Sequence, residues 1–150
     1  MPENEPDWKT TPRFPEALAL HKSIYGGNGR AIAKKALVVE NRSDVATFAG
    51  RACSKRGYSV VYASDIENAR RKYENDKSIA FAVVDVDLGM NEHMNLAAEM
   101  ANNGIIVVGH GRQSRQDVPN PVKRNYLRIG MDPRGLSSCI KGATKYKSSR

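Results

Sequence analysis

The sequence has few of the residues that build disulfide frameworks, metal clusters or membrane spans. Its 150 residues include two cysteines, and neither lies in a metal-type cluster. The longest apolar stretches, such as 36–39 and 105–108, fall far short of the roughly 20 residues needed to cross a bilayer. Residues 1–16 lack the apolar centre of a signal peptide. We therefore expect a soluble cytoplasmic protein with no membrane insertion, in which Cys53 and Cys139 are buried free thiols on apolar helix faces.

Acidic residues are scarce in the last third of the chain. The net charge is +8, and residues 113–150 contain nine basic and two acidic residues, a net charge of +7. Such a surface attracts an acidic partner protein, a membrane surface or nucleic acid. For the final residues, 145–150, a solvated tail explains the charge equally well.

The first 34 residues differ in composition from the rest. Residues 1–14 hold three prolines and many polar groups, which is typical of a disordered arm. Pro15 then begins a short apolar helix that ends at the glycine-rich linker 26–29. We therefore expect an N-terminal extension over 1–34, one domain over 35–146, and a basic tail over 147–150.

From Lys35 onward, strand and helix patterns alternate. Short apolar runs predict five strands, at 36–40, 58–62, 79–86, 105–108 and 126–129. Apolar residues at helical spacing predict helices at 43–56, 64–73 and 91–102, and a last helix capped by Asp132-Pro133. This alternation predicts an α/β fold: a doubly wound, five-stranded parallel sheet with helices on both faces.

Polar residues and glycines gather where these predicted strands end. In a parallel sheet of this kind, the functional crevice lies beyond the carboxyl ends of the strands. The residues expected there are Glu40, Asn41, Asp85, Asp87, Gly109, His110 and Gly130. The two histidines near this edge, His93 and His110, have no metal-type partner in the sequence, and we expect both to be exposed loop residues.

Four segments together resemble the receiver domain of two-component response regulators. They are ALVVEN, AFAVVDVDLG, IIVVG and YLRIGMDP, and the resemblance covers residues 35–143. It implies the flavodoxin-like receiver fold, in which an aspartate at the end of the third strand accepts a phosphoryl group with Mg²⁺ bound. Asp85 falls on that position. Glu40 falls on one of the metal-binding acidic positions, and Asp87 falls where the family supplies a backbone carbonyl, so the resemblance implies Glu40, Asp85 and Asp87 as the Mg²⁺ site.

Other family positions carry different residues here. Asn41 replaces the second acidic residue, Gly109 replaces the hydroxyl residue of the fourth strand, and Ile129 replaces the lysine of the fifth. Tyr126 falls on the aromatic switch position, whose hydroxyl partner is then missing. Phosphoryl transfer needs donors for a transition state rich in negative charge, and losing one such donor costs about 10²–10³ in rate. The resemblance therefore implies a degenerate receiver, or pseudo-receiver.

The segment between the fourth and fifth strands also departs from the family. Residues 112–124 contain two prolines and little apolar periodicity, so the fourth helix of the receiver is expected to be shortened or missing. This segment, the strand after it and the last helix carry a set of basic residues that we expect to form a partner surface. They are Arg112, Arg115, Lys123, Arg124, Arg128 and Arg134.

Three functions follow from these patterns. The leading hypothesis is a signalling domain, not an enzyme, that acts through protein–protein contact and is not switched by ordinary aspartyl phosphorylation. The alternative is a phosphorelay receiver that uses Asp85, with Mg²⁺ as its cofactor and a histidine kinase or another regulator as its partner. The third is nucleic-acid binding through the basic C-terminal third, although few aromatic residues lie among its basic residues.

Overall fold

The computed structural model describes residues 34–88, 91–128, 134–146 and 148. All of these belong to one unit of the chain, Lys34–Arg150. The expectations for the N-terminal extension, for Ile129 and Gly130, and for the helix cap at Asp132-Pro133 fall outside the described residues.

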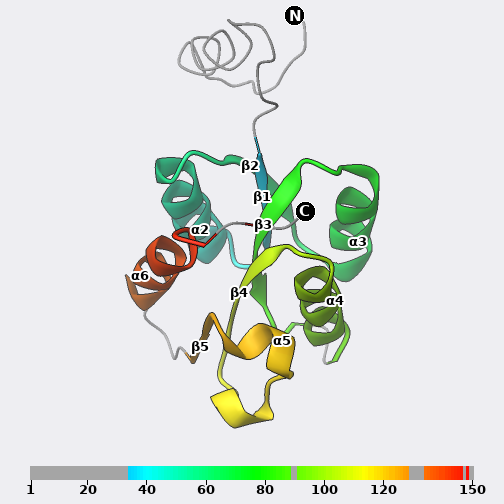
Figure 1. Cartoon of the computed structure of the whole chain (residues 1–150), viewed down its shortest axis with the longest axis vertical. Helices are drawn as coiled ribbons and strands as arrows, with labels where there is room; N and C mark the ends of the chain where they lie inside the picture. The colour runs from blue at the N-terminus through cyan, green and yellow to red at the C-terminus, as the bar shows by residue number, and fades with distance from the viewer. Residues whose placement is uncertain (1–33, 89–90, 129–133, 147, 149–150) are drawn as a thin grey trace, which may run out of the picture. The chain divides into compact units, whose positions relative to one another are not determined.

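Five parallel strands form a single sheet in the order β2-β1-β3-β4-β5 (Figure 1). Their bounds are β1 Lys35–Val39, β2 Ser59–Ala63, β3 Ile79–Asp85, β4 Ile106–Gly111 and β5 Tyr126–Arg128. Every pairing between neighbouring strands is parallel. This confirms the predicted sheet.

Five α-helices cover the two faces of this sheet. Their bounds are α2 Ser43–Lys55, α3 Ile66–Asn75, α4 Asn91–Asn102, α5 Asn120–Lys123 and α6 Arg134–Ala143. Helices α2 and α6 lie on one face, whereas α3, α4 and the short α5 lie on the other (Figure 1). The doubly wound α/β architecture predicted from the sequence is therefore confirmed.

The central strand β3 is buried along its whole length, since it has a strand on each side and a helical layer over each face. Its alternate residues point to opposite layers: Phe81 and Val83 pack toward α2 and α6, and Ala82 and Val84 toward α3 and α4. This explains why the run from 79 to 84 is continuously apolar instead of alternating.

The segment between β4 and β5 is shortened, as predicted. It contains one 3₁₀ turn, Arg115–Asp117, and then the four residues of α5, with Pro121 in its first turn. Pro119 is the N-cap of α5, just before its first turn. At this position the missing backbone N–H of proline interrupts no helical hydrogen bond. The fourth helix of the receiver pattern is thus reduced to about a single turn.

The start of α3 differs from the prediction by one residue, and the end of α2 depends on a glycine. We expected Ser64 to start α3, but the N-cap is Asp65, whose carboxylate accepts a hydrogen bond from the Asn68 backbone N–H at 2.8 Å. A carboxylate at the N-cap also interacts favourably with the helix dipole. Gly57, after α2, has φ +94°, a conformation that glycine adopts without a steric penalty.

Three further expectations concern thiols and membranes. Both cysteines are free; Cys53 is buried and Cys139 is half-buried. Within the residues that the structure describes, no helix is both long and apolar enough to span a membrane.

Candidate functional site

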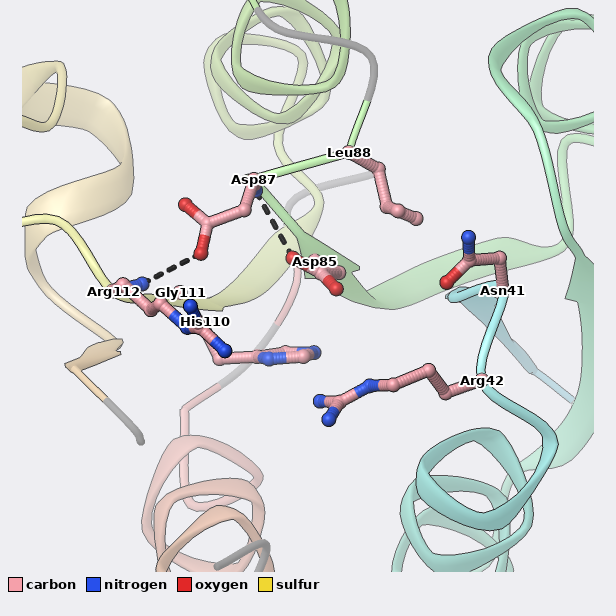
Figure 2. A pocket seen from close by; sticks show the side chains of 8 residues that line it. All are labelled: Asn41, Arg42, Asp85, Asp87, Leu88, His110, Gly111 and Arg112. Atoms are coloured by element: carbon pink, nitrogen blue, oxygen red, sulfur yellow. Dashed lines mark hydrogen bonds between the residues drawn. The ribbon is translucent and has the colours of Figure 1, made fainter. Parts of the chain in front are cut away.

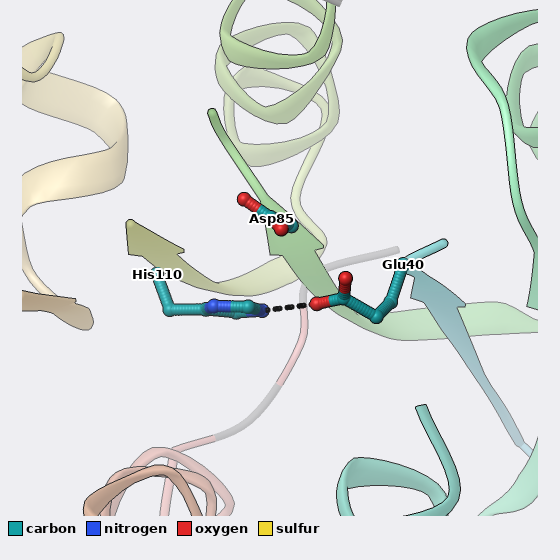
Figure 3. A group of neighbouring side chains, drawn as sticks. All are labelled: Glu40, Asp85 and His110. Atoms are coloured by element: carbon teal, nitrogen blue, oxygen red, sulfur yellow. Dashed lines mark ion pairs between the residues drawn. The ribbon is translucent and has the colours of Figure 1, made fainter. Parts of the chain in front are cut away.

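Three buried polar side chains meet at the carboxyl edge of the sheet. Glu40 directly follows β1, Asp85 is the last residue of β3, and His110 lies in β4 (Figure 3). One ligand-type atom from each lies within 4.8 Å of the other two. Because neighbouring parallel strands end at the same edge, the fold itself brings these residues together.

The closest contact in this cluster joins the imidazole to the Glu40 carboxylate. His110 Nε2 lies 3.3 Å from Glu40 Oε1, and both side chains are at most 2% exposed. The contact lacks hydrogen-bond alignment, and neither atom has a hydrogen-bond partner among the described residues. It is therefore an ion pair only when His110 is protonated.

Burial and charge affect the two carboxyl groups differently. Burial, followed by the nearby Glu40 carboxylate, raises the pKa of Asp85 to about 6. Burial also acts to raise the pKa of Glu40, but contacts with His110 and the Arg42 backbone N–H outweigh it and hold that pKa below its ordinary value. Asp85 is thus the group of the pair that takes up a proton more readily.

A cavity of about 400 Å³ borders two members of this cluster, Asp85 and His110 (Figure 2). Its lining includes Asn41, Arg42, Asp85, Asp87, His110 and Arg112. The Asp87 carboxylate is not part of the buried cluster; it is exposed and accepts a hydrogen bond from the Arg112 backbone N–H at 2.7 Å. Asp87 thereby ties the end of β3 to the end of β4.

The cluster differs from the set Glu40, Asp85 and Asp87 that the sequence resemblance implied. His110 takes the third place, and Asp87 points to Arg112 (Figures 2 and 3). The exposed Asn41 supplies an amide in place of a second carboxylate at the end of β1. The site therefore combines two carboxylates with one imidazole nitrogen.

The strand register places Gly109 and His110 on opposite faces of the sheet. His110 pairs with Asp85, so these two residues share a face of the sheet, whereas Gly109 pairs with Val84 and belongs to the opposite face. A β-carbon at Gly109 would lie 2.8 Å from Val122 Cγ1 and 3.4 Å from Tyr126 Cδ1. The residue of β4 that faces Asp85 is consequently His110.

Neither histidine near the site is an exposed loop residue, contrary to expectation. His110 is 1% exposed within β4, and His93 is 3% exposed on α4. The expectation was wrong for His110 because β4 continues through Gly111, beyond the predicted end at residue 108. The signal available in the sequence was the alternation Val108-Gly109-His110, which places His110 on the same face as Val108.

The Tyr126 side chain is buried and anchored near the site. Its hydroxyl donates a hydrogen bond to the Gln113 carbonyl at 2.7 Å, and its ring packs where Gly109 has no side chain. Burial raises the pKa of Tyr126 to about 12. Ile129, the fourth of the expected altered switch positions, lies outside the described residues.

Several of the basic residues expected at a partner surface are held by backbone carbonyls or an aromatic ring. Arg128 Nε donates to the Arg112 carbonyl at 3.1 Å, and Arg115 Nε donates to the Lys123 carbonyl at 2.8 Å. The Arg124 guanidinium lies 4.1 Å from the centre of the Tyr146 ring. Arg128 thus stabilises the β4–β5 edge, while the side chain of Arg134 lies outside the described set.

Comparisons with known proteins identify the fold class. No family model and no curated protein matches the sequence. Among solved structures, a receiver domain protein from Methanospirillum hungatei is 20% identical, with a TM-score of 0.59 over 76% of this chain and 95% of its own. A response regulator from Thermotoga maritima is 17% identical, with a TM-score of 0.58 over 77% of this chain and 100% of its own. A receiver domain protein from Clostridium thermocellum is 21% identical, with a TM-score of 0.57 over 75% and 94%.

The chain therefore has the fold of a response-regulator receiver domain. The likeness extends over about three-quarters of this chain and nearly the whole of the matched receiver domains. At identities of about 20%, it establishes the architecture, while the chemistry of the site rests on the residues at the sheet edge.

Proposed function

We propose that this protein is a receiver-fold signalling module that acts through protein–protein contacts and is not switched by ordinary phosphorylation of Asp85. One observation carries the proposal: the His110 imidazole occupies the β4 position that faces Asp85 and contacts Glu40 at 3.3 Å. A phosphoryl group on Asp85 needs a cation and hydrogen-bond donors around its oxygens. Here the β4 side chain beside Asp85 is the imidazole of His110, and this side chain is buried.

The residues around the cluster support the same conclusion. Asn41 offers no charge to a cation, and the Arg128 side chain donates to the Arg112 carbonyl. The anchored Tyr126 has no neighbouring hydroxyl side chain at Gly109 to couple it to Asp85. We propose that the module performs no catalysis of its own and that its partner is another signalling protein.

Treatment with acetyl phosphate and Mg²⁺ tests the proposal. We expect intact mass to show no phosphoryl adduct and amide spectra to show no shifts at Gly109 or Tyr126. The matched variant combines Asn41→Asp with His110→Thr, which adds a carboxylate at the end of β1 and puts a hydroxyl in place of the imidazole beside Asp85. We expect that variant to gain an adduct, and a further Asp85→Asn change to remove it.

Stoichiometric phosphorylation of the unaltered chain at Asp85, with shifts around Tyr126, would overturn the proposal in favour of a phosphorelay receiver. Neither the fold nor the comparisons favour nucleic-acid binding, the third function considered from the sequence.

The basic surface near α5 is the proposed contact region for the signalling partner. Arg115 and Arg124 are exposed there. Affinity capture from native cell extract should lose its specific partner when both are changed to glutamate. The matched control changes the exposed Arg51 and Lys55 of α2 to glutamate, and capture should persist. Equal loss in the two variants would place the contact elsewhere.

A further inference from the structure

The buried cluster has a donor set that does not suit Mg²⁺, the cation implied by the receiver fold. Mg²⁺ prefers near-octahedral oxygen ligands, usually one or two carboxylates and several waters. In this chain the third side chain of the cluster is an imidazole, and the end of β1 offers the neutral Asn41 beside Glu40. Imidazole nitrogen is instead a ligand for Zn²⁺ and its neighbours among the transition metals.

We propose that Glu40, Asp85 and His110 form a binding site for a divalent transition-metal cation of the Zn²⁺ class. The three donors come from the ends of three adjacent strands, β1, β3 and β4, so the sheet holds their backbones at fixed spacing. The inference goes beyond the proposed signalling role and does not rest on it.

The unpartnered atoms of the cluster are the observation that points to a ligand. Glu40 Oε1 and His110 Nε2 are buried, lie 3.3 Å apart and have no hydrogen-bond partner among the described residues. Leaving such buried atoms without a partner is unfavourable, and a bound cation would satisfy both. Ligands placed about 2.0–2.2 Å from a shared cation lie roughly 3–4 Å apart, so this pair already has the spacing of neighbouring ligands.

Charge and access also fit a divalent cation. Two carboxylates and a neutral imidazole would balance its charge, whereas the guanidinium of Arg42, with Nε 3.7 Å from Glu40 Oε2, belongs to a side chain that is 43% exposed. The cavity of about 400 Å³ reaches Asp85 and His110. It provides an entry route and room for water at the remaining coordination positions.

The test uses the full chain after removal of metals with a chelator. Calorimetric titration with Zn²⁺ and with Mg²⁺ should give one tightly bound Zn²⁺ per chain, with an affinity at least about 100-fold above that for Mg²⁺. Glu40→Gln and Asp85→Asn should each weaken Zn²⁺ binding by about 100-fold, since even the loss of an outer partner costs 10–100-fold. Zn²⁺ should also shift the imidazole nitrogen resonances of His110 and leave those of His93 unchanged.

Asp87→Asn is the matched control, because it makes the same chemical change in the same cavity at a carboxylate outside the cluster. It should leave Zn²⁺ affinity nearly unchanged. Three results would each overturn the proposal: no Zn²⁺ binding, binding that persists in Glu40→Gln and Asp85→Asn, or equal affinity for Mg²⁺. None of them bears on the proposed signalling role, which the phosphorylation and capture experiments test.

Discussion

His110 and Asp85 lie in register on adjacent strands, with the imidazole and the carboxylate on the same face of the sheet. This pairing places a buried imidazole beside Asp85. The same ring also contacts Glu40, with His110 Nε2 3.3 Å from Glu40 Oε1. A single β4 side chain therefore borders both acidic residues.

The first prediction concerns the pH dependence of stability. The pKa of Asp85 is raised from 3.8 to about 6 by burial and by Glu40; the other ionisable side chains at this cavity are Arg42, Asp87, His110 and Arg112. A carboxyl with a raised folded-state pKa stabilises the fold fully below its unfolded-state pKa, and this contribution is lost as the pH rises through about 6. Asp85→Asn, which has no proton to lose, should therefore gain stability relative to the unaltered chain between pH 4 and 7, by up to about 2–3 kcal/mol.

Urea unfolding at several pH values, with a chelator present, measures this difference. Asp87→Asn is the control, because it makes the same chemical change at an exposed carboxylate of the same cavity. A constant offset between Asp85→Asn and the unaltered chain from pH 4 to 7 would contradict the raised pKa.

The second prediction concerns the close packing at Gly109. A β-carbon there would lie 2.8 Å from Val122 Cγ1, so Gly109→Ala must displace the Val122 side chain on α5. Overpacking of this kind costs about 1–3 kcal/mol. Thermal or urea unfolding should show the loss.

Gly142→Ala in α6 is the matched control for Gly109→Ala, since nothing lies within 4 Å of the added carbon. It should instead raise the free energy of unfolding by about 0.5–1 kcal/mol, because alanine favours a helix more than glycine does. Equal effects of the two substitutions would show that the space around Gly109 is not restrictive.

The architecture was predictable because its signals are local. The apolar run that became β3, the helical spacing that became α4 and the glycine after α2 each depend on residues close in the sequence. The same holds for the ends of β1 and β3, which placed Glu40 and Asp85 at one edge of the sheet.

The identity of the third cluster residue was not predictable in this way. Gly109 and Gly111 flank His110, and glycine has a weak preference for strands, so the sequence favoured a loop. Pairing with β3 on one side and β5 on the other keeps this segment extended as far as Gly111. Register between strands far apart in sequence depends on tertiary packing, which local patterns do not contain.

The third prediction concerns the reactivity of Cys53. Burial raises the pKa of this thiol to about 12. The Cys53 side chain lies on the face of α2 that packs against the sheet, and it is fully buried there. Since the thiolate is the reactive form, iodoacetamide at pH 8 should modify Cys53 only as fast as the protein unfolds. The rate of labelling is measured by mass spectrometry in a Cys139→Ser variant. If Cys53 were modified as fast without denaturant as in concentrated urea, that result would contradict its burial.

The last prediction separates the two residues that precede α3. Asp65 accepts hydrogen bonds from the Asn68 backbone N–H at 2.8 Å and from its side-chain amide at 3.0 Å, and these contacts hold the pKa of Asp65 below its ordinary value. Asp65→Ala removes the cap and should lower the melting temperature by a few degrees. Ser64→Ala, one residue earlier, should leave it unchanged, because Ser64 lies outside the helix in an exposed position. If Ser64→Ala were the more damaging change, Ser64 would be the N-cap, with Glu67 at capping-box spacing from it, and α3 would begin one residue earlier than the structure places it.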